Sequence, residues 1–285
     1  MKIKNKVSGT DFEAQNLPHH RGQLFVDVIK LQWRKLFLMG FLVLVGFLPV
    51  IIVLFYRDNY IANITANYLA GNITLEMRQK AAKTAHFYTG LLTWALTYVA
   101  IIPLAGVARI YRQLAWNEPV FIKEDFQRGI KDNYRIAAIC STIFGFVLII
   151  SKLIIVLSDN ILLPMIPVAI FLACIFPMLL IAFFQSTIYQ GNFKTFMKNA
   201  FLIFIRDALR IYLFSLMMLL PLAFNLIETH ALWKYGLIIA YILFLFPLTY
   251  LAFAIFSNYL FDKYINHIHY PHLSRKGLYR PSKDV

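Results

Sequence analysis

"EDFQRGIKDNYR", residues Glu124 to Arg135, decides the fold because this charged segment lies between two of the most apolar segments of the chain. It holds three acids and three bases, and Lys123 directly before it adds a fourth base. Phe126, Ile130 and Tyr134 recur every four residues, which places them on one stripe of an amphipathic helix. We expect this helix to lie in a membrane interface, with its aromatic stripe in the headgroup boundary and its charges in water.

The rest of the chain has the composition of a membrane protein. Of its 285 residues, 60% are hydrophobic and only 15% are charged. A spanning helix needs roughly 20 apolar residues, because lipid offers no hydrogen-bond partner to the backbone. Six segments meet this requirement: 36–56, 87–107, 136–157, 161–184, 211–227 and 232–256. The fold class predicted is therefore all-α, a polytopic membrane protein with six transmembrane helices.

The spacing of the quoted helix recurs before two other predicted spans. The matching positions are Phe25, Ile29 and Trp33 before Arg34, and Phe201, Ile205 and Leu209 before Arg210. Each even-numbered span also carries a proline in its later half: Pro103, Pro177 and Pro247. The sequence therefore predicts three pseudo-repeats, each an interfacial amphipathic elbow helix followed by a helical hairpin, related by an axis along the membrane normal.

Basic residues predict the orientation of a single membrane domain over residues 1–285. It comprises a cytoplasmic arm and first elbow (1–35), a six-span bundle (36–261) and a cytoplasmic tail (262–285). One side of the predicted membrane carries 22 of the 28 Lys and Arg residues, and such residues are retained in the cytoplasm. Both termini are expected there, and residues 57–86 are expected to form a long loop on the opposite, outer side. Anionic lipid headgroups account for the basic surface, so the bilayer is the expected partner and nucleic acid is not.

Residues 103–140, "PLAGVARIYRQLAWNEPVFIKEDFQRGIKDNYRIAAIC", resemble the signature region of the YesL-like family of bacterial integral membrane proteins of unknown activity. The matching positions are Pro103, Arg112, Glu118, Pro119, Asp125, Phe126 and Asn133. The resemblance implies a multi-pass protein of the bacterial plasma membrane, linked by genomic neighbourhood to carbohydrate uptake and breakdown. It implies no catalytic residues and no cofactor.

Charged residues are scarce inside the predicted spans. No Asp or Glu lies in any of the six, which weakens the case for transport coupled to protons or sodium. Lys152 is the one charge within a span, five residues from its outer end. We expect its side chain to snorkel to the interface, and the alternative is that it pairs with a group such as Glu228 or lines a polar cavity.

Arg34, Arg135 and Arg210 occupy equivalent points of the three repeats, where each elbow turns into its span. They are candidates for binding anionic lipid or a soluble anion. An inward-facing ring of three guanidinium groups would require an anion among them, whereas a rim arrangement lets each meet a lipid phosphate. The apolar stripe before each arginine favours the rim. The tail "INHIHYPH" reads as a solvated segment rather than a metal site.

Three functions remain open. The first is a non-enzymatic accessory or assembly factor, assisting a carbohydrate transporter. The second is a passive or gated conduit along the pseudo-threefold axis, for which the polar candidates are Thr93, Thr97, Ser151 and Asn225. The third is a membrane enzyme, which would depend on the one dense acidic group, Glu118, Glu124 and Asp125.

The orientation can be tested with single cysteines in a background lacking Cys140 and Cys174. Ala70→Cys is expected to react with an impermeant thiol reagent added to intact cells, and Gln127→Cys is not, because the bases place them on opposite sides. Labelling at residue 127 without permeabilisation would reverse the topology.

Overall fold

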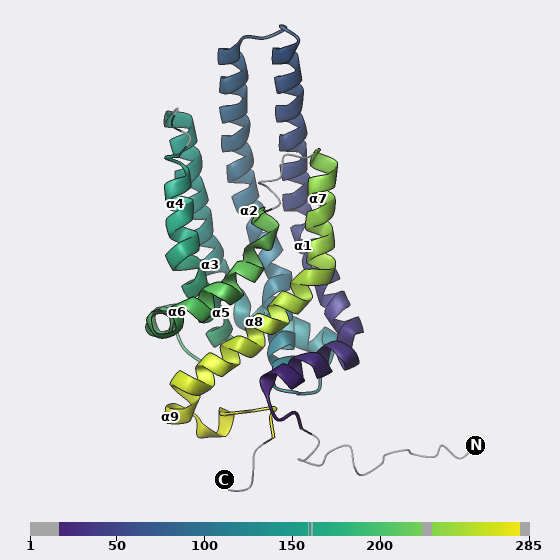
Figure 1. The fold of residues 1–285 in the computed structure, drawn as a ribbon, viewed down its shortest axis with the longest axis vertical. Helices are drawn as coiled ribbons and strands as arrows, with labels where there is room; N and C mark the ends of the chain where they lie inside the picture. The colour runs from purple at the N-terminus through teal and green to yellow at the C-terminus, as the bar shows by residue number, and fades with distance from the viewer. Residues whose placement is uncertain (1–16, 159, 161, 224–229, 280–285) are drawn as a thin grey trace, which may run out of the picture.

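The computed structural model describes residues 17–158, 160, 162–223 and 230–279, and helices dominate them (Figure 1). The long helices are α1 (Arg21–Leu69), α2 (Leu75–Ala115), α3 (Ile122–Leu157) and α6 (Phe193–Ala223). Two further runs are interrupted by a π turn: α4 (Met165–Ile170), η2 (Phe171–Ile175) and α5 (Phe176–Ser186), then α7 (Ala231–Ala240), η4 (Tyr241–Leu245) and α8 (Phe246–Phe261).

These helices confirm an all-α polytopic membrane protein. Five helical runs among the described residues are long and apolar enough to cross a membrane. The remaining predicted span, 211–227, begins within α6, and its residues 224–227 lie outside the described part of the chain. We call the end of the bundle that holds residues 17 and 279 the base, and the opposite end, at the turn of residues 70–74, the tip (Figure 1).

Two of the three expected elbows bend where they meet their span. Gln32 in α1 has φ −123° and ψ 16°, and Asp207 in α6 has φ −131° and ψ 31°, so both helices break near the end of the repeated motif. In Figure 1 the first part of α1 accordingly lies across the base before the helix rises. The second elbow, in contrast, continues into its span as one unbroken helix, α3.

The prolines of the even spans have different local effects. Pro177 and Pro247 each follow a five-residue π turn, η2 and η4. Proline lacks an N–H and its ring clashes with the carbonyl of the preceding turn, and a π turn accommodates both defects. Pro103 lies inside α2, which continues without such a turn.

The apolar stripes of the elbows face different surroundings, which corrects the expectation that the Glu124 to Arg135 helix dips its stripe into lipid. Phe126 and Tyr134 are half-buried and pack against the protein core, and so do Phe25 and Ile29 of the first elbow. In the third elbow the whole stripe, Phe201, Ile205 and Leu209, is exposed. Only that elbow has the exposed stripe of an interfacial helix.

The segment expected as a long outer loop, residues 57–86, is a helical hairpin. α1 runs to Leu69 and α2 begins at Leu75, so the loop itself is a turn of a few residues. Gly71 adopts φ +77°, a conformation that residues with a Cβ rarely take, and the Thr74 hydroxyl accepts the N–H of Met77 at 3.3 Å. A left-handed glycine ends the first helix and a threonine N-cap starts the second.

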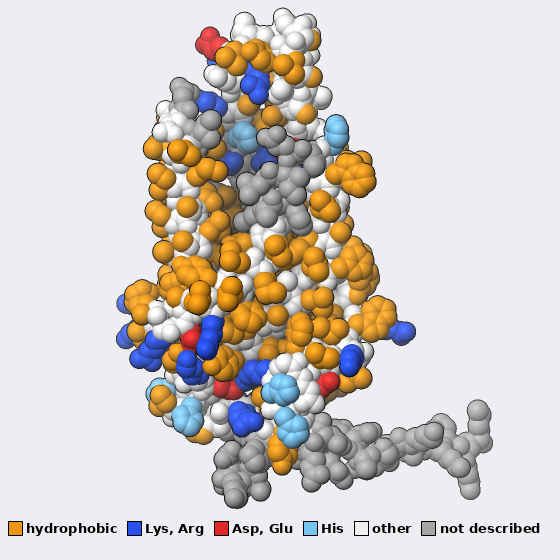
Figure 2. Space-filling view, in the orientation of Figure 1, with side chains coloured by type: hydrophobic (Ala, Val, Ile, Leu, Met, Phe, Trp, Pro, Cys, Tyr) orange, Lys and Arg blue, Asp and Glu red, His pale blue; other side chains and the backbone are white. Residues whose placement is uncertain are grey.

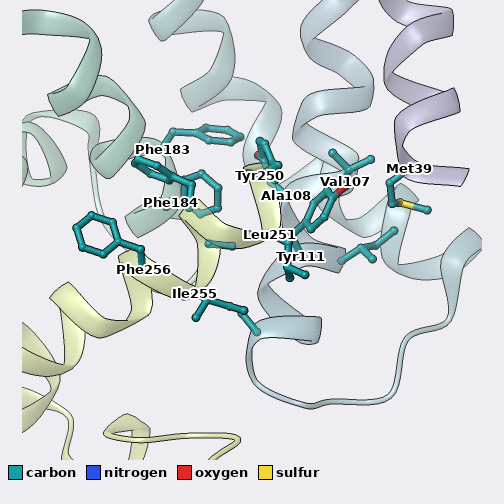
Figure 3. Packing of buried hydrophobic residues seen from close by; sticks show 14 of the residues in the cluster. Met39, Val107, Ala108, Tyr111, Phe183, Phe184, Tyr250, Leu251, Ile255 and Phe256 are labelled. Atoms are coloured by element: carbon teal, nitrogen blue, oxygen red, sulfur yellow. The ribbon is translucent and has the colours of Figure 1, made fainter. Parts of the chain in front are cut away.

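Buried hydrophobic side chains of α2, α5 and α8 pack together in the core (Figure 3). The ring of Tyr250 in α8 lies 4.7 Å from that of Tyr111 in α2 and 5.1 Å from that of Phe184 in α5, measured between centroids. Tyr111, Phe184 and Tyr250 are buried. The three even-numbered spans thus converge on one aromatic cluster.

α1 packs closely against two of these spans because it carries glycine at the contacts. A Cβ at Gly46 would lie 2.4 Å from Pro103 Cγ, and one at Gly40 would lie 2.7 Å from the carbonyl oxygen of Leu243 and 2.9 Å from Pro247 Cγ. Real Cβ atoms do not approach other atoms so closely, so both contacts require glycine.

Gly40→Ala is therefore expected to lower the stability of the bundle by about 1–3 kcal/mol, because the new methyl group overlaps a backbone oxygen. Gly236→Ala is the matched control, since a Cβ there meets no atom within 4 Å and alanine favours helix by about 1 kcal/mol. Melting temperatures of the purified protein in detergent give the comparison. Equal shifts for the two variants would contradict the close α1–η4 contact.

Candidate functional site

Most of the residues that carry the family resemblance meet at the base, around the turn between α2 and α3. Arg112 lies in the last turn of α2, Glu118 and Pro119 in the connection, and Asp125 in the first turns of α3. Phe126 packs on Gly106, where a Cβ would lie 2.5 Å from its ring. The other two positions, Asn133 and Pro103, lie deeper in the bundle, and Pro103 faces α1 instead.

Asp125 organises the start of α3. Its carboxylate accepts the backbone N–H of Phe121 at 2.8 Å, and the backbone N–H of Asp125 donates to the carbonyl of Phe121 in return. It also accepts from Arg109 at 3.4 Å. Burial alone would raise the pKa of Asp125, but hydrogen bonds from Phe121, Gln113 and Arg109 outweigh it and hold that pKa below its ordinary value.

Arg109 joins two carboxylates of α3. Its Nη1 donates to Asp132 at 3.0 Å while its Nε donates to Asp125. Asp125 is almost fully buried, whereas the Asp132 side chain is 54% exposed. The sequence did not single out Arg109 as a partner of these carboxylates. A signal was present, because Asp125 follows closely after a helix end that carries arginines.

Arg112 connects the same turn to the end of α5. Its Nη1 donates to the Thr187 carbonyl at 2.8 Å, and its guanidinium lies 5.0 Å from the Trp116 ring centroid. Glu118 lies 4.0 Å from Arg112 and 2.7 Å from Lys276, whose Nζ is 4.2 Å from the same indole ring. Glu118 thus pairs with both cations around Trp116, and these contacts hold three segments of the chain together.

Asn133 ties α3 to α2 from inside the bundle. Its Nδ2 donates to the Ala105 carbonyl at 3.3 Å, while its Oδ1 is shielded from solvent without a hydrogen-bond partner. Gly129, one turn earlier, approaches the backbone of α2 so closely that a Cβ would lie 2.4 Å from the Gly106 oxygen. The motif positions near the turn therefore fix the α2–α3 packing and present charges that are already paired.

Residues 262–279 form a packed foot under the base, although His267, His269 and His272 of the histidine-rich segment are exposed, as expected. Gly277 adopts φ +82° against the Trp116 backbone, Leu278 is buried, and the Tyr279 N–H donates to the Pro18 carbonyl at 3.0 Å. The foot contains η5 (Asp262–Asn266), α9 (His267–His269) and η6 (Pro271–Leu273). Among the described residues, no group of three metal-ligating side chains is found.

Arg34, Arg135 and Arg210 all have exposed positions. The Arg34 guanidinium lies 5.8 Å from the Trp33 ring centroid, and Arg210 donates to the Tyr259 hydroxyl at 3.1 Å and lies 3.5 Å from Asp207. Their surface positions suit contact with lipid phosphates. Anion or lipid binding by these three residues stays a prediction.

A second charged cluster lies where the hairpin leaves the bundle. Asp58 accepts from Arg57 at 2.8 Å, from Tyr235 at 2.9 Å and from Lys234. The stem of Lys152 packs on Gly90, where a Cβ would lie 2.9 Å from Lys152 Cγ, and its charge interacts with those of Arg57 and Asp58. Glu228, the partner considered for Lys152, lies outside the described residues.

Comparison with known proteins gives no match: no family model, no curated protein and no solved structure is similar to this chain.

Substitutions can separate the stability contributed by the buried pair Arg109–Asp125 from that contributed by the exposed pair Arg109–Asp132. Asp125→Ala is expected to destabilise the protein by about 3 kcal/mol, because it leaves Arg109 and the start of α3 without their buried partner. Asp132→Ala, which removes the exposed partner of the same arginine, is expected to cost less than about 1 kcal/mol. Melting temperatures in detergent test the difference, and similar losses would show that Asp125 is not the organising residue.

Proposed function

We propose that this chain is a non-enzymatic accessory or assembly factor of the bacterial plasma membrane, YesL-like in kind, which assists a carbohydrate transporter. In this proposal both termini are cytoplasmic, so the base faces the cytoplasm and the hairpin of residues 57–86 faces outward. The observation that carries the proposal is the projection of this hairpin beyond the bundle (Figure 1).

The hairpin is longer than a membrane crossing requires. From the bend at Gln32 to Leu69, α1 has 37 residues, or about 55 Å at 1.5 Å per residue, against a hydrocarbon core of about 30 Å. The charged residues Arg57 and Asp58 mark the end of its apolar run. The part beyond them, residues 59–69, extends about 17 Å further, which is enough to reach a neighbouring protein outside the bilayer.

Large apolar side chains are exposed at the end of this hairpin. Leu69 is 78% exposed, Met77 57% and Leu75 46%, and all three lie within a few residues of the turn. In the part of the chain described, the hairpin is two helices packed on each other, so this end has no cover from the rest of the bundle (Figure 1). Apolar groups at a projecting end support contact with a partner protein.

The conduit proposal has weaker support because two of its four candidate polar residues pair with their neighbours. Thr97 and Ser141 share a hydrogen bond of 2.7 Å between α2 and α3, and the Ser151 hydroxyl donates to the Pro164 carbonyl at 2.9 Å. Such pairs favour helix packing over a polar path. Thr93 is buried in α2 with no hydrogen-bond partner for its hydroxyl in the described structure, and Asn225 lies outside the described residues.

Copurification from native membranes tests the proposal. Tagged full-length protein is expected to retain a transporter subunit in stoichiometric amount, and the triple variant L69S/L75S/M77S is expected to retain at least tenfold less. Replacing three large apolar side chains with serine removes several kcal/mol of the binding free energy that their burial in an interface would provide.

The matched control is N63S/N67S/Q79S, which changes three exposed polar residues of the same hairpin. It is expected to retain the partner at the wild-type level. Retention by the apolar triple variant would contradict the proposed contact, and solute flux through the purified protein in liposomes would replace the accessory role with the conduit.

A further inference from the structure

A cavity of about 630 Å³ opens at the base between the start of α1 and the foot. We call it the basal cavity. Its walls come from residues 19–21, from the end of α8 with η5 and α9, and from residues 275 and 278. Figure 2 shows Lys, Arg and His side chains gathered at this end of the molecule. Segments from both ends of the chain therefore build one hollow in a basic surface.

Asp262 holds two arginines at the wall of the basal cavity. Its carboxylate forms an ion pair with Arg21 and accepts the backbone N–H of Arg275 at 2.9 Å. Asn266 donates to the same carboxylate at 2.7 Å and accepts from the Tyr189 hydroxyl at 2.6 Å. Asp262 is therefore fully engaged in positioning the wall, and the wall is built rather than a chance cluster of surface side chains.

The positive charge around the basal cavity is only partly neutralised. Arg21 and Arg275 are close enough to interact unfavourably, and Asp262 is the single carboxylate that lines the cavity with them. Lys263 also lines it, but it pairs with Asp207 at 2.9 Å. Among the described residues, no ion pair is formed by the Arg275 side chain. One guanidinium charge is thus left for a ligand.

Two sets of hydrogen-bond donors at the wall lack protein acceptors. Arg21 Nη1 is shielded from solvent and has no hydrogen-bond partner in the described structure, which is costly for a charged donor. α1 begins at Arg21 with no side-chain cap from His20 and no acid in its first turn. Its free N–H groups and helix dipole therefore favour an anion at the same wall.

We propose that the basal cavity binds the phosphate group of a ligand, held by Arg21, Arg275 and the N-terminus of α1. Bidentate contact of the phosphate with Arg275 matches guanidinium geometry, and Arg21 adds its positive charge at the same wall. His20 and His267 line the cavity and can donate further N–H bonds. The cavity is larger than one phosphate, so the phosphate is borne by a lipid headgroup or by a soluble phosphate compound.

Two arms of one experiment distinguish these sources. In the first, full-length protein in phosphatidylcholine nanodiscs is titrated with inorganic phosphate at constant ionic strength, and the melting temperature is followed. In the second, protein in detergent is mixed with phosphatidylglycerol or phosphatidylcholine, and bound lipid is counted by native mass spectrometry. Saturable stabilisation in the first arm identifies a soluble ligand, and retention of one phosphatidylglycerol in the second identifies a lipid.

Arg275→Gln is expected to weaken the binding seen in either arm about tenfold, through loss of one charge-assisted contact. Arg128→Gln, which removes an exposed arginine of α3 away from the cavity, is expected to leave binding unchanged. If Arg275→Gln does not fold, His267→Ala provides the second variant, with at least a twofold loss expected. Absence of saturable binding in both arms, or equal weakening by Arg128→Gln, would overturn the proposal. The proposal does not depend on the hairpin partner.

Discussion

Two glycines of α1 set the distances on which the bundle depends. At Gly46 the helix rests on Pro103 of α2, and at Gly40 it rests on the π turn and Pro247 at the start of α8. Lipid provides little hydrophobic force between helices, so stability comes from close packing of this kind. With α1 held between two proline-bearing spans, the ends of α2 and α8 are directed together, and the tyrosine pair at the base is a consequence.

The base is held by ion pairs, whereas the middle of the bundle is held by packing. Arg109 and Arg112 lie in the last turns of α2, and their carboxylate partners lie in the connection or in α3. Because one carboxylate, Asp125, is almost fully buried, its pair also fixes the direction in which α3 leaves the turn. Of the charges in residues 124–135, Asp125 thus belongs to the joint between two helices, whereas Glu124, Arg128, Lys131, Asp132 and Arg135 form an exposed face.

Hydropathy predicted the spans because the bilayer requires apolar residues at every position exposed to lipid. Hydropathy could not predict the secondary structure and packing of the segments outside the bilayer. The elbows show the limit: the same spacing of large apolar residues is internal at Phe126, where Gly106 provides a place for the ring, and external at Phe201. The hairpin was missed because its helices are polar, although Gly71 and Thr74 marked their ends. Nothing in the spacing around Lys276 or Asp262 indicated their long-range partners.

The ion pair between Arg21 and Asp262 joins residues 241 positions apart, and the backbone bond between Pro18 and Tyr279 joins the chain over an even longer interval. During synthesis the start of α1 emerges first, and its partners emerge only after every helix of the bundle has been made. Until then, the N-terminal end of the first helix lacks its contacts with Asp262 and Tyr279. The foot can close only after residues 262–279 have been made, and a chain truncated before residue 262 would leave the base open to proteases.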